Sequence, residues 1–454
     1  MASSTGTVNA ANRLDRLPIS KVHTAVLVAL AFAYFFELGD LNTFAYAAPV
    51  LISAWGLQVS TIGFITSASF LGMFLGAAIG GWVADSIGRR RSLIVMIAWF
   101  SLFSLLNALA WDPVSLGVFR FLTGVGLSAM TIIANTYISE FFPPTSRGRY
   151  QGWAMTFGLL GIPATAWVAR LIIPLAPWAW RLVFVWGGLG AIFLILALRL
   201  EESPRWLEKH GLLDRAEASL QRLEGETERQ RGPLPAAAAE GKEVVVSRVP
   251  LGELFQGVYL SRTVVLLLAW IFQTLGFYGF VSWVPTLLVA HGFSVVSSLT
   301  YSSIIALGAP VGALIASQIS ERFDRKWLIV IVSLATVVFG LAYGLTFQPS
   351  LIVVAGFLVT LSIQCFAPLL YAYTPELYPT EARALGTGIT YGVGRLANIV
   401  GPLIVSSLYA SAGYTSVFVY VAATWLGVAL VVGIWGPLTR FRPLHKLSQT
   451  QVGV

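Results

Sequence analysis

The sequence has few charged residues, a single cysteine and only four histidines. Asp, Glu, Lys and Arg make up 11% of the 454 residues, whereas 56% are hydrophobic. A water-soluble fold cannot hide so much apolar surface, so this composition excludes a soluble globular protein. The single cysteine, Cys365, excludes an internal disulfide framework. The histidines are scattered and predict neither a metal cluster nor a catalytic triad, which argues against a membrane enzyme: His23, His210, His291 and His445.

Long apolar runs are the main feature that the sequence does contain. A helix of about 20 apolar residues crosses a hydrocarbon core of about 30 Å. Twelve such stretches can be counted, at 24–53, 60–84, 92–111, 114–139, 150–174, 180–199, 264–290, 299–320, 327–347, 351–374, 384–411 and 415–437. The first exceeds the length of a signal-peptide core and has no cleavage site after it, so we expect it to remain as a helix. The sequence therefore predicts an all-α membrane protein with twelve transmembrane helices.

The net charge of +8 comes from basic residues that follow a pattern. Apart from Arg120, Arg170, Arg181 and Arg395, every Lys and Arg falls in a tail or in every second loop between the predicted helices. Loops rich in Lys and Arg stay on the cytoplasmic side of a membrane, so we expect both termini to be cytoplasmic. This topology, with attraction to anionic lipid, accounts for the basic excess without a nucleic-acid partner.

Two motifs recur at one offset. Asp85 and Arg89 correspond to Glu321 and Arg325, and a second motif that contains Glu140 and Arg147 corresponds to one that contains Glu376 and Arg383, always 236 positions later. Parallel repeats of this kind are a recurrent transporter design, with the substrate held between the halves. The expected segments are an N-terminal tail (1–23), a six-helix half (24–199), a central cytoplasmic loop (200–262), a second six-helix half (263–438) and a C-terminal tail (439–454).

Several motifs resemble a known family. The segments are 81–90 (GWVADSIGRR), 202–207 (ESPRWL), 375–380 (PELYPT), 13–18 (RLDRLP) and 36–41 (FELGDL). Together they resemble the major facilitator superfamily, and within it the bacterial metabolite:proton symporters, which include aromatic-acid and nicotinate carriers and are related to sugar porters and organic-ion transporters. The resemblance implies two pseudo-symmetric six-helix halves. Family members often have aspartate in place of Glu37, and Phe323–Asp324 replaces Ile-Gly, which implies a degenerate second gate motif.

Glu37 and Asp40 lie three residues apart near the middle of the first predicted helix. This spacing places both on one helix face, far from either membrane surface. An ionised carboxylate there is costly and a second one adds repulsion, so one of them can bind and release a proton. We expect Asp40 to carry the proton and Glu37 to tune it or act as a second site. The alternative is a carboxylate held permanently by an arginine or by backbone donors.

Arg395 is the predicted substrate cation. It shares one stripe of the eleventh predicted helix with Tyr391, Asn398 and Pro402. A guanidinium matches a carboxylate with two parallel hydrogen bonds, and the neighbouring Tyr and Asn can fix its orientation. The alternative is that Arg395 only neutralises Asp40 or Glu37.

Other polar and aromatic residues are candidates for the substrate site. In the seventh and tenth helices they suit a planar organic ligand, although each aromatic ring can equally be a packing residue. They are Gln273, Tyr278, Trp283, Gln364 and Tyr371. In the fourth helix a stripe contains Arg120, Gly124, Ser128, Thr131 and Asn135. Because Arg120 lies near the outer end and small residues favour close helix contact, we expect this stripe to serve mainly in packing, with Asn135 as a substrate contact.

Opposite charges at the cytoplasmic helix ends suggest a gate. The expected pairs are Asp85 with Arg89, Glu140 with Arg147, Glu202 with Arg205, Glu321 with Arg325 and Glu376 with Arg383. Such pairs can hold the two halves together in one state and separate when the halves move apart. The alternative is topology plus ordinary surface pairing.

These features predict a secondary active transporter that moves a small organic carboxylate by proton-coupled symport. A sugar or polyol porter, a drug efflux carrier and a non-transporting sensor are the alternatives, but a sensor would need a soluble output domain for which the tails and loop are too short. We expect no cofactor, the proton as coupling ion, a monomer, and a bacterial inner membrane as the location.

Overall fold

The structure is a computed structural model that describes residues 9–236, 250–320 and 322–439. In these ranges it is helical and has no strand. The first half contains α2 (Lys21–Trp55), α3 (Val59–Ile87), α4 (Arg89–Ala108), α5 (Pro113–Phe141), α6 (Pro144–Leu159), α7 (Gly161–Ile172), α8 (Trp180–Gly188) and α9 (Leu194–Leu198). The second contains α12 (Gly257–Val281), α13 (Val284–Ala290), α14 (Val295–Ala306), α15 (Gly308–Ile319), α16 (Arg325–Leu345), α17 (Pro349–Glu376) and α18 (Thr380–Trp435).

Twelve membrane crossings follow from these elements. Eleven helical segments are long and apolar enough to cross a membrane, and one of them is the 55-residue segment Glu381–Trp435. A straight helix of that length would extend about 80 Å, far beyond a hydrocarbon core of about 30 Å. Gly413 breaks the segment with φ 77° and ψ −170°, so that α18 makes two crossings. The break lies between the two helices predicted at 384–411 and 415–437, and the predicted all-α membrane fold is confirmed.

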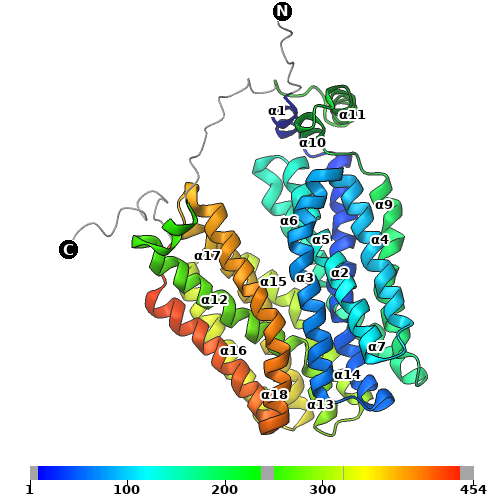
Figure 1. The fold of residues 1–454 in the computed structure, drawn as a ribbon. Coiled ribbons are helices and arrows are strands. Elements are labelled where there is room, and N and C mark those ends of the chain that lie inside the picture. Colours follow the sequence, from blue (N-terminus) through cyan, green and yellow to red (C-terminus); the bar gives the residue numbers. More distant parts are fainter. Residues whose placement is uncertain (1–8, 237–249, 321, 440–454) are drawn as a thin grey trace, which may run out of the picture.

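The two halves lie side by side and diverge towards one end (Figure 1). At the opposite end they are in contact. Gly63 of α3 lies so close to α18 that a Cβ atom there would be 2.7 Å from Ser406 Oγ, and Arg170 of α7 donates a hydrogen bond to Thr300 of α14. Nearer the middle, the rings of Phe70 and Tyr278 lie 4.7 Å apart.

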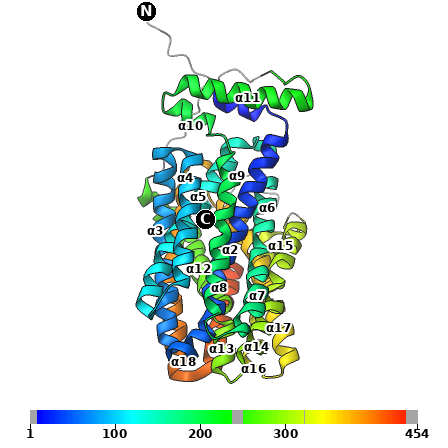
Figure 2. The ribbon, with the colours of Figure 1, turned by 90° about the vertical axis from the view of Figure 1, so that its right-hand side faces the viewer.

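A small helical layer covers the diverging end of the first half. The layer consists of α1 (Ala10–Asp15), α10 (Pro204–Lys209) and α11 (Leu213–Arg231). We call the end of the bundle at which the two halves diverge, and on which this layer lies, the capped end. In Figure 2, α11 lies across the bundle. Arg13 bonds both Glu217 and Glu224 of α11, and Leu14 is buried with Leu220. These contacts join the N-terminal segment to the segment that follows α9.

Close helix contact confirms part of the packing interpretation of α5. A Cβ atom on Gly124 would lie 2.3 Å from the Ser69 carbonyl oxygen of α3, and one on Gly72 of α3 would lie 2.0 Å from the Phe121 carbonyl oxygen. Glycine is therefore required at both positions, because only glycine lets the two backbones approach so closely.

Candidate functional site

Asp40 lies at the centre of the first half and is fully buried. Ser104 of α4 donates a hydrogen bond to Asp40 Oδ1. Arg120 of α5 lies 3.4 Å from Asp40 Oδ2 through Nη1, which also contacts Thr43 Oγ1 at 3.3 Å. Since Arg120 is itself 1% exposed, this is an isolated carboxylate–guanidinium pair inside the membrane-spanning bundle. Both charges are costly to bury alone, so each stabilises the other.

This pair corrects two expectations. The α5 stripe was expected to serve mainly in packing; this holds for Gly124 but not for Arg120, which faces Asp40. The sequence also offered Arg395 as a partner for Asp40, whereas the structure pairs Asp40 with Arg120. Glu37 is also buried on α2, but the described ion pair of Arg120 is with Asp40 and not with Glu37, so the two carboxyl groups occupy different environments.

Arg395 lies between the halves, on the first crossing of α18. Its Nη2 donates a 2.5 Å hydrogen bond to Tyr391 Oη, and its Nη1 donates a 2.6 Å hydrogen bond to Ser128 Oγ of α5. Its guanidinium carbon also lies 4.8 Å from the centroid of the Tyr391 ring. The structure therefore places the predicted cation beside the predicted tyrosine and adds Ser128, a residue of the other half.

Aromatic rings surround Tyr391. The ring of Tyr371 of α17 lies 5.4 Å from it, and the ring of Trp270 of α12 lies 5.0 Å from it. Trp270 is fixed by a 3.0 Å hydrogen bond from Nε1 to Thr374 Oγ1, whereas Tyr371 is 51% exposed. Exposure of so large a ring on the face between the halves leaves an aromatic surface for a planar ligand beside Arg395.

The other predicted substrate residues are dispersed. Asn135 Oδ1 accepts hydrogen bonds from Tyr34 and Gln151. Gln273 is buried and accepts a hydrogen bond from its neighbour Thr274. Tyr278 packs on Phe70 across the halves. Asn398 Oδ1 is buried without a partner among the described residues.

Trp283 and Gln364 lie farther from the capped end than Arg395 does. Trp283 is 1% exposed within the hydrophobic core, which favours its alternative interpretation as a packing residue. Gln364 lines a small cavity between the halves.

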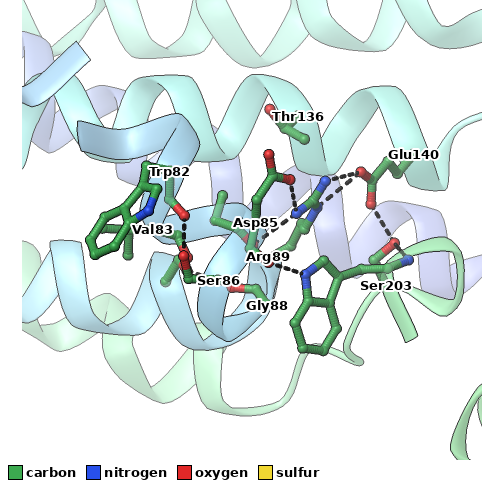
Figure 3. A network of polar contacts seen from close by, with 12 residues as sticks. Trp82, Val83, Asp85, Ser86, Gly88, Arg89, Thr136, Glu140 and Ser203 are labelled. Atoms are coloured by element: carbon green, nitrogen blue, oxygen red, sulfur yellow. Dashed lines mark hydrogen bonds and ion pairs between the residues drawn. The ribbon is translucent and has the colours of Figure 1, made fainter. Parts of the chain in front are cut away.

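Arg89 is the centre of a polar network at the capped end (Figure 3). It donates to Asp85 Oδ1 at 2.7 Å and to Glu140 Oε1 at 2.9 Å, and Glu140 accepts a further bond from Ser203. In the second half Arg325 pairs with Glu376. Both Arg–Glu pairs join residues 51 positions apart, so the internal repeat extends to the contacts themselves.

Three predicted gate pairs are wrong, because the motifs pair with each other rather than within themselves. Glu140 bonds Arg89, while Arg147 bonds the Phe142 carbonyl oxygen. Glu376 bonds Arg325, while Arg383 bonds the Pro375 carbonyl oxygen. Glu202 accepts a hydrogen bond from the backbone N–H of Arg90, while Arg205 bonds Asp15 of α1.

Of the other two predicted gate pairs, Asp85 and Arg89 do form an ion pair, and Glu321 lies outside the described residues. Each observed pair lies within one half, so in this conformation the pairs do not join the halves.

Ser104 was missed by the sequence analysis, which named Arg120 and Ser128 only as members of a stripe expected to serve in packing. Serine is common in membrane helices, so nothing distinguished Ser104 or Ser128 from packing residues. Arg120 carried a usable signal, because an arginine inside a membrane helix needs an opposite charge, although the sequence did not show that this charge is Asp40. Among the described residues, no group of three or more His, Cys, Asp and Glu side chains could hold a metal ion.

Twelve crossings in two repeated halves, with buried ionisable residues on helices that face the division between them, define a polytopic membrane transporter. A family model described as "Sugar (and other) transporter" matches residues 21–450. The chain belongs to this family, which is part of the major facilitator superfamily, and it is a transporter of metabolites rather than an enzyme.

Individual relatives agree with this assignment. The chain is 48% identical over 437 residues to the putative metabolite transport protein YyaJ of Bacillus subtilis, covering 96% of this chain and 97% of that protein. It is 31% identical over 440 residues to the niacin transporter NiaP of Acinetobacter baylyi, covering 96% and 99%. The fold resembles the partially occluded inward-open xylose transporter XylE of E. coli with a TM-score of 0.75 at 18% identity, over 93% of this chain and all of that one.

Proposed function

We propose that this protein takes up a small organic carboxylate together with protons across a bacterial inner membrane. The observation that carries the proposal is Arg395, a guanidinium between the halves that is held by Tyr391 and Ser128 and has no carboxylate hydrogen-bonded to it among the described residues. A site for a neutral sugar would need no such cation. The niacin transporter among the relatives supports the proposal, since niacin is a planar carboxylic acid.

Asp40 is the proposed proton carrier. Its partner Arg120 favours the ionised form, whereas the surrounding apolar helices favour the neutral form. Protonation of Asp40 would release Arg120 from its only hydrogen-bonded carboxylate in the described part of the chain. Loss of this pair would weaken the contact between α2 and α5. Such a local change of charge and hydrogen bonding can bias the relative positions of the two halves. No cofactor takes part in this scheme.

The capped end is the proposed cytoplasmic side. Basic residues concentrate there, including Arg89, Arg147 and Arg325, in agreement with the positive-inside rule. With this orientation the conformation is inward-facing, because the halves diverge at the capped end (Figure 1). We propose that one chain suffices for transport, since both halves of the site come from the same chain.

One binding experiment tests the carboxylate assignment. Purified protein is titrated with benzoate and with benzamide, which has the same ring without the charge. Wild type should prefer the acid. Arg395→Lys keeps the charge but loses the planar fork, so benzoate affinity should fall about tenfold, and Arg395→Gln should lose about 10- to 100-fold together with the preference for the acid.

Arg229→Gln on the exposed surface of α11 is the matched control and should bind like wild type. Equal affinity of wild type for acid and amide, or binding of an uncharged sugar in preference to both, would overturn the assignment and favour a sugar porter.

A further inference from the structure

A small cavity lies between the halves on the side of Arg395 that is remote from the capped end. Its volume is about 30 Å³, enough for roughly one water-sized group. The first half contributes Tyr46 and Ile162 to its wall. The second half contributes mostly apolar side chains such as Phe280, together with the polar residues Ser302, Thr360 and Gln364. The cavity is therefore complete only when the halves are closed at this end.

Ser302 is the unusual member of this wall. Its side chain is 4% exposed, and its Oγ has no hydrogen-bond partner among the described residues. Two nearby buried serines of α14 are satisfied, since Ser303 donates to the Leu299 carbonyl oxygen and Ser298 to the Pro285 carbonyl oxygen, both at 2.7 Å. Buried hydroxyl groups are seldom left unpaired. An unpaired hydroxyl on the wall of a cavity indicates a partner that enters the cavity.

The cavity has a defined position relative to the proposed carboxylate site. Gln364 precedes Tyr371 by seven residues on α17, which is two helical turns or about 10 Å on the same face. Tyr371 packs on Tyr391, which holds Arg395. Tyr371 and Tyr391 therefore lie on the capped-end side of Arg395, and the cavity lies on the other side. A ligand whose carboxylate lies on Arg395 can direct its other end towards Gln364 and Ser302, away from these two rings.

We propose that this cavity is a subsite for a hydroxyl or carbonyl oxygen at the end of the substrate remote from its carboxylate, bound by Ser302 and Gln364. The inference rests on the proposed transport of organic acids and narrows it to acids with a second polar group. The mostly apolar wall leaves room for a single oxygen but not for a further ring, so the subsite selects by both hydrogen bonding and size.

The test compares ligands that differ by one hydroxyl group. Benzoate, 3-hydroxybenzoate and 4-hydroxybenzoate are titrated against wild type and against Ser302→Ala and Gln364→Leu. Wild type should bind at least one hydroxybenzoate about tenfold or more tightly than benzoate, because a site built to hydrogen-bond a hydroxyl rejects an analogue without it. Each variant should reduce that ratio towards one, and Ser302→Ala should leave benzoate affinity within about twofold.

Ser303→Ala is the control, since its hydroxyl bonds its own helix, and it should keep the wild-type ratio. A ratio near one in wild type, or an unchanged ratio in both Ser302→Ala and Gln364→Leu, would show that the cavity holds only a structural water and would overturn the subsite. If none of the three acids binds while a sugar does, the proposed carboxylate function itself fails, which is a distinct result.

Discussion

Arg395 of the second half donates a 2.6 Å hydrogen bond to Ser128 of the first half. Ser128 follows Arg120 by eight residues on α5, or about 12 Å along the helix, and Arg120 pairs with Asp40. One helix therefore contacts both the proposed proton carrier and the proposed substrate cation. Because Arg395 belongs to the other half, a carboxylate that replaces Ser128 as its partner would alter a contact between the halves.

Substitution of Ser128 by alanine should weaken this contact without removing the cation. A hydrogen bond to a charged group contributes about 1.5 to 3 kcal/mol, so the orientation of Arg395 should become less fixed. Because a less fixed cation should bind the carboxylate substrate more weakly, we expect KM to rise by about 3- to 30-fold, with a smaller change in maximal rate. Uptake into proteoliposomes measures both, and Ser139→Ala, whose hydroxyl bonds its own helix, should be silent.

Removal of the ionisable group of Asp40 should abolish proton coupling but leave substrate binding intact. Asp40→Asn keeps the size of the side chain and can still accept from Ser104, but it cannot ionise. We expect proton-driven accumulation to be lost, while exchange of labelled for unlabelled substrate persists. Proteoliposomes with and without an imposed pH gradient distinguish the two. Accumulation at the wild-type level in Asp40→Asn would refute the assignment.

The sequence predicted the helices well because membrane insertion imposes a simple rule of length and apolarity, which holds at each crossing. It predicted which residues are charged and buried, but not which of them meet. Arg89 pairs with Glu140 across 51 positions, whereas the sequence favoured partners within a motif. Pairing of this kind depends on how α4 packs on α5, and this tertiary packing cannot be deduced from a local sequence pattern. The same holds for Asp40 and Arg120, 80 positions apart.

Gly187 tests the tight space around Asp40. A Cβ atom at Gly187 would lie 2.0 Å from Asp40 Oδ1 and 2.7 Å from Ser104 Oγ, so Gly187→Ala must displace the carboxylate. We expect this variant to impair proton-driven accumulation as Asp40→Asn does, although no ionisable group has changed. Gly340→Ala, where nothing lies within 4 Å of the added atom, is the control for insertion and folding. Normal coupling in Gly187→Ala would show that the proton site tolerates displacement.

The network at the capped end should be asymmetric in its contribution to stability. Arg89 is 8% exposed and Glu140 15%, whereas Asp85 is 60% exposed. Arg89→Ala leaves the carboxylate of Glu140 without its cation and should cost about 3 kcal/mol, whereas Asp85→Ala should cost about 0 to 1 kcal/mol. Thermal unfolding of purified protein should therefore rank wild type and Asp85→Ala close together and Arg89→Ala well below. Equal losses in the two variants would contradict this ranking.

The attachment of α1 to α11 should depend on pH. Partial burial favours the neutral form of Glu224, but hydrogen bonds and charges from Arg13 and Arg16 outweigh this effect and lower its pKa. The Arg13 guanidinium likewise lowers the pKa of Glu217. A carboxylate with a lowered pKa stabilises the folded contact above its ordinary pKa of about 4.3, and the contribution is lost as pH falls through the lowered value.

Acidification from pH 7 to below about 4 should therefore release α1, and Glu224→Gln should loosen it already at pH 7. Spin labels at Ala11 and Glu226, both exposed, can report this in a Cys365→Ser background as a broadened distance distribution. Arg222→Gln is the control, because its pair with Glu201 is largely exposed and such pairs contribute little. A distribution that stays narrow in Glu224→Gln at pH 7 would show that burial of Leu14 and Leu17, rather than the ion pairs, holds α1 in place.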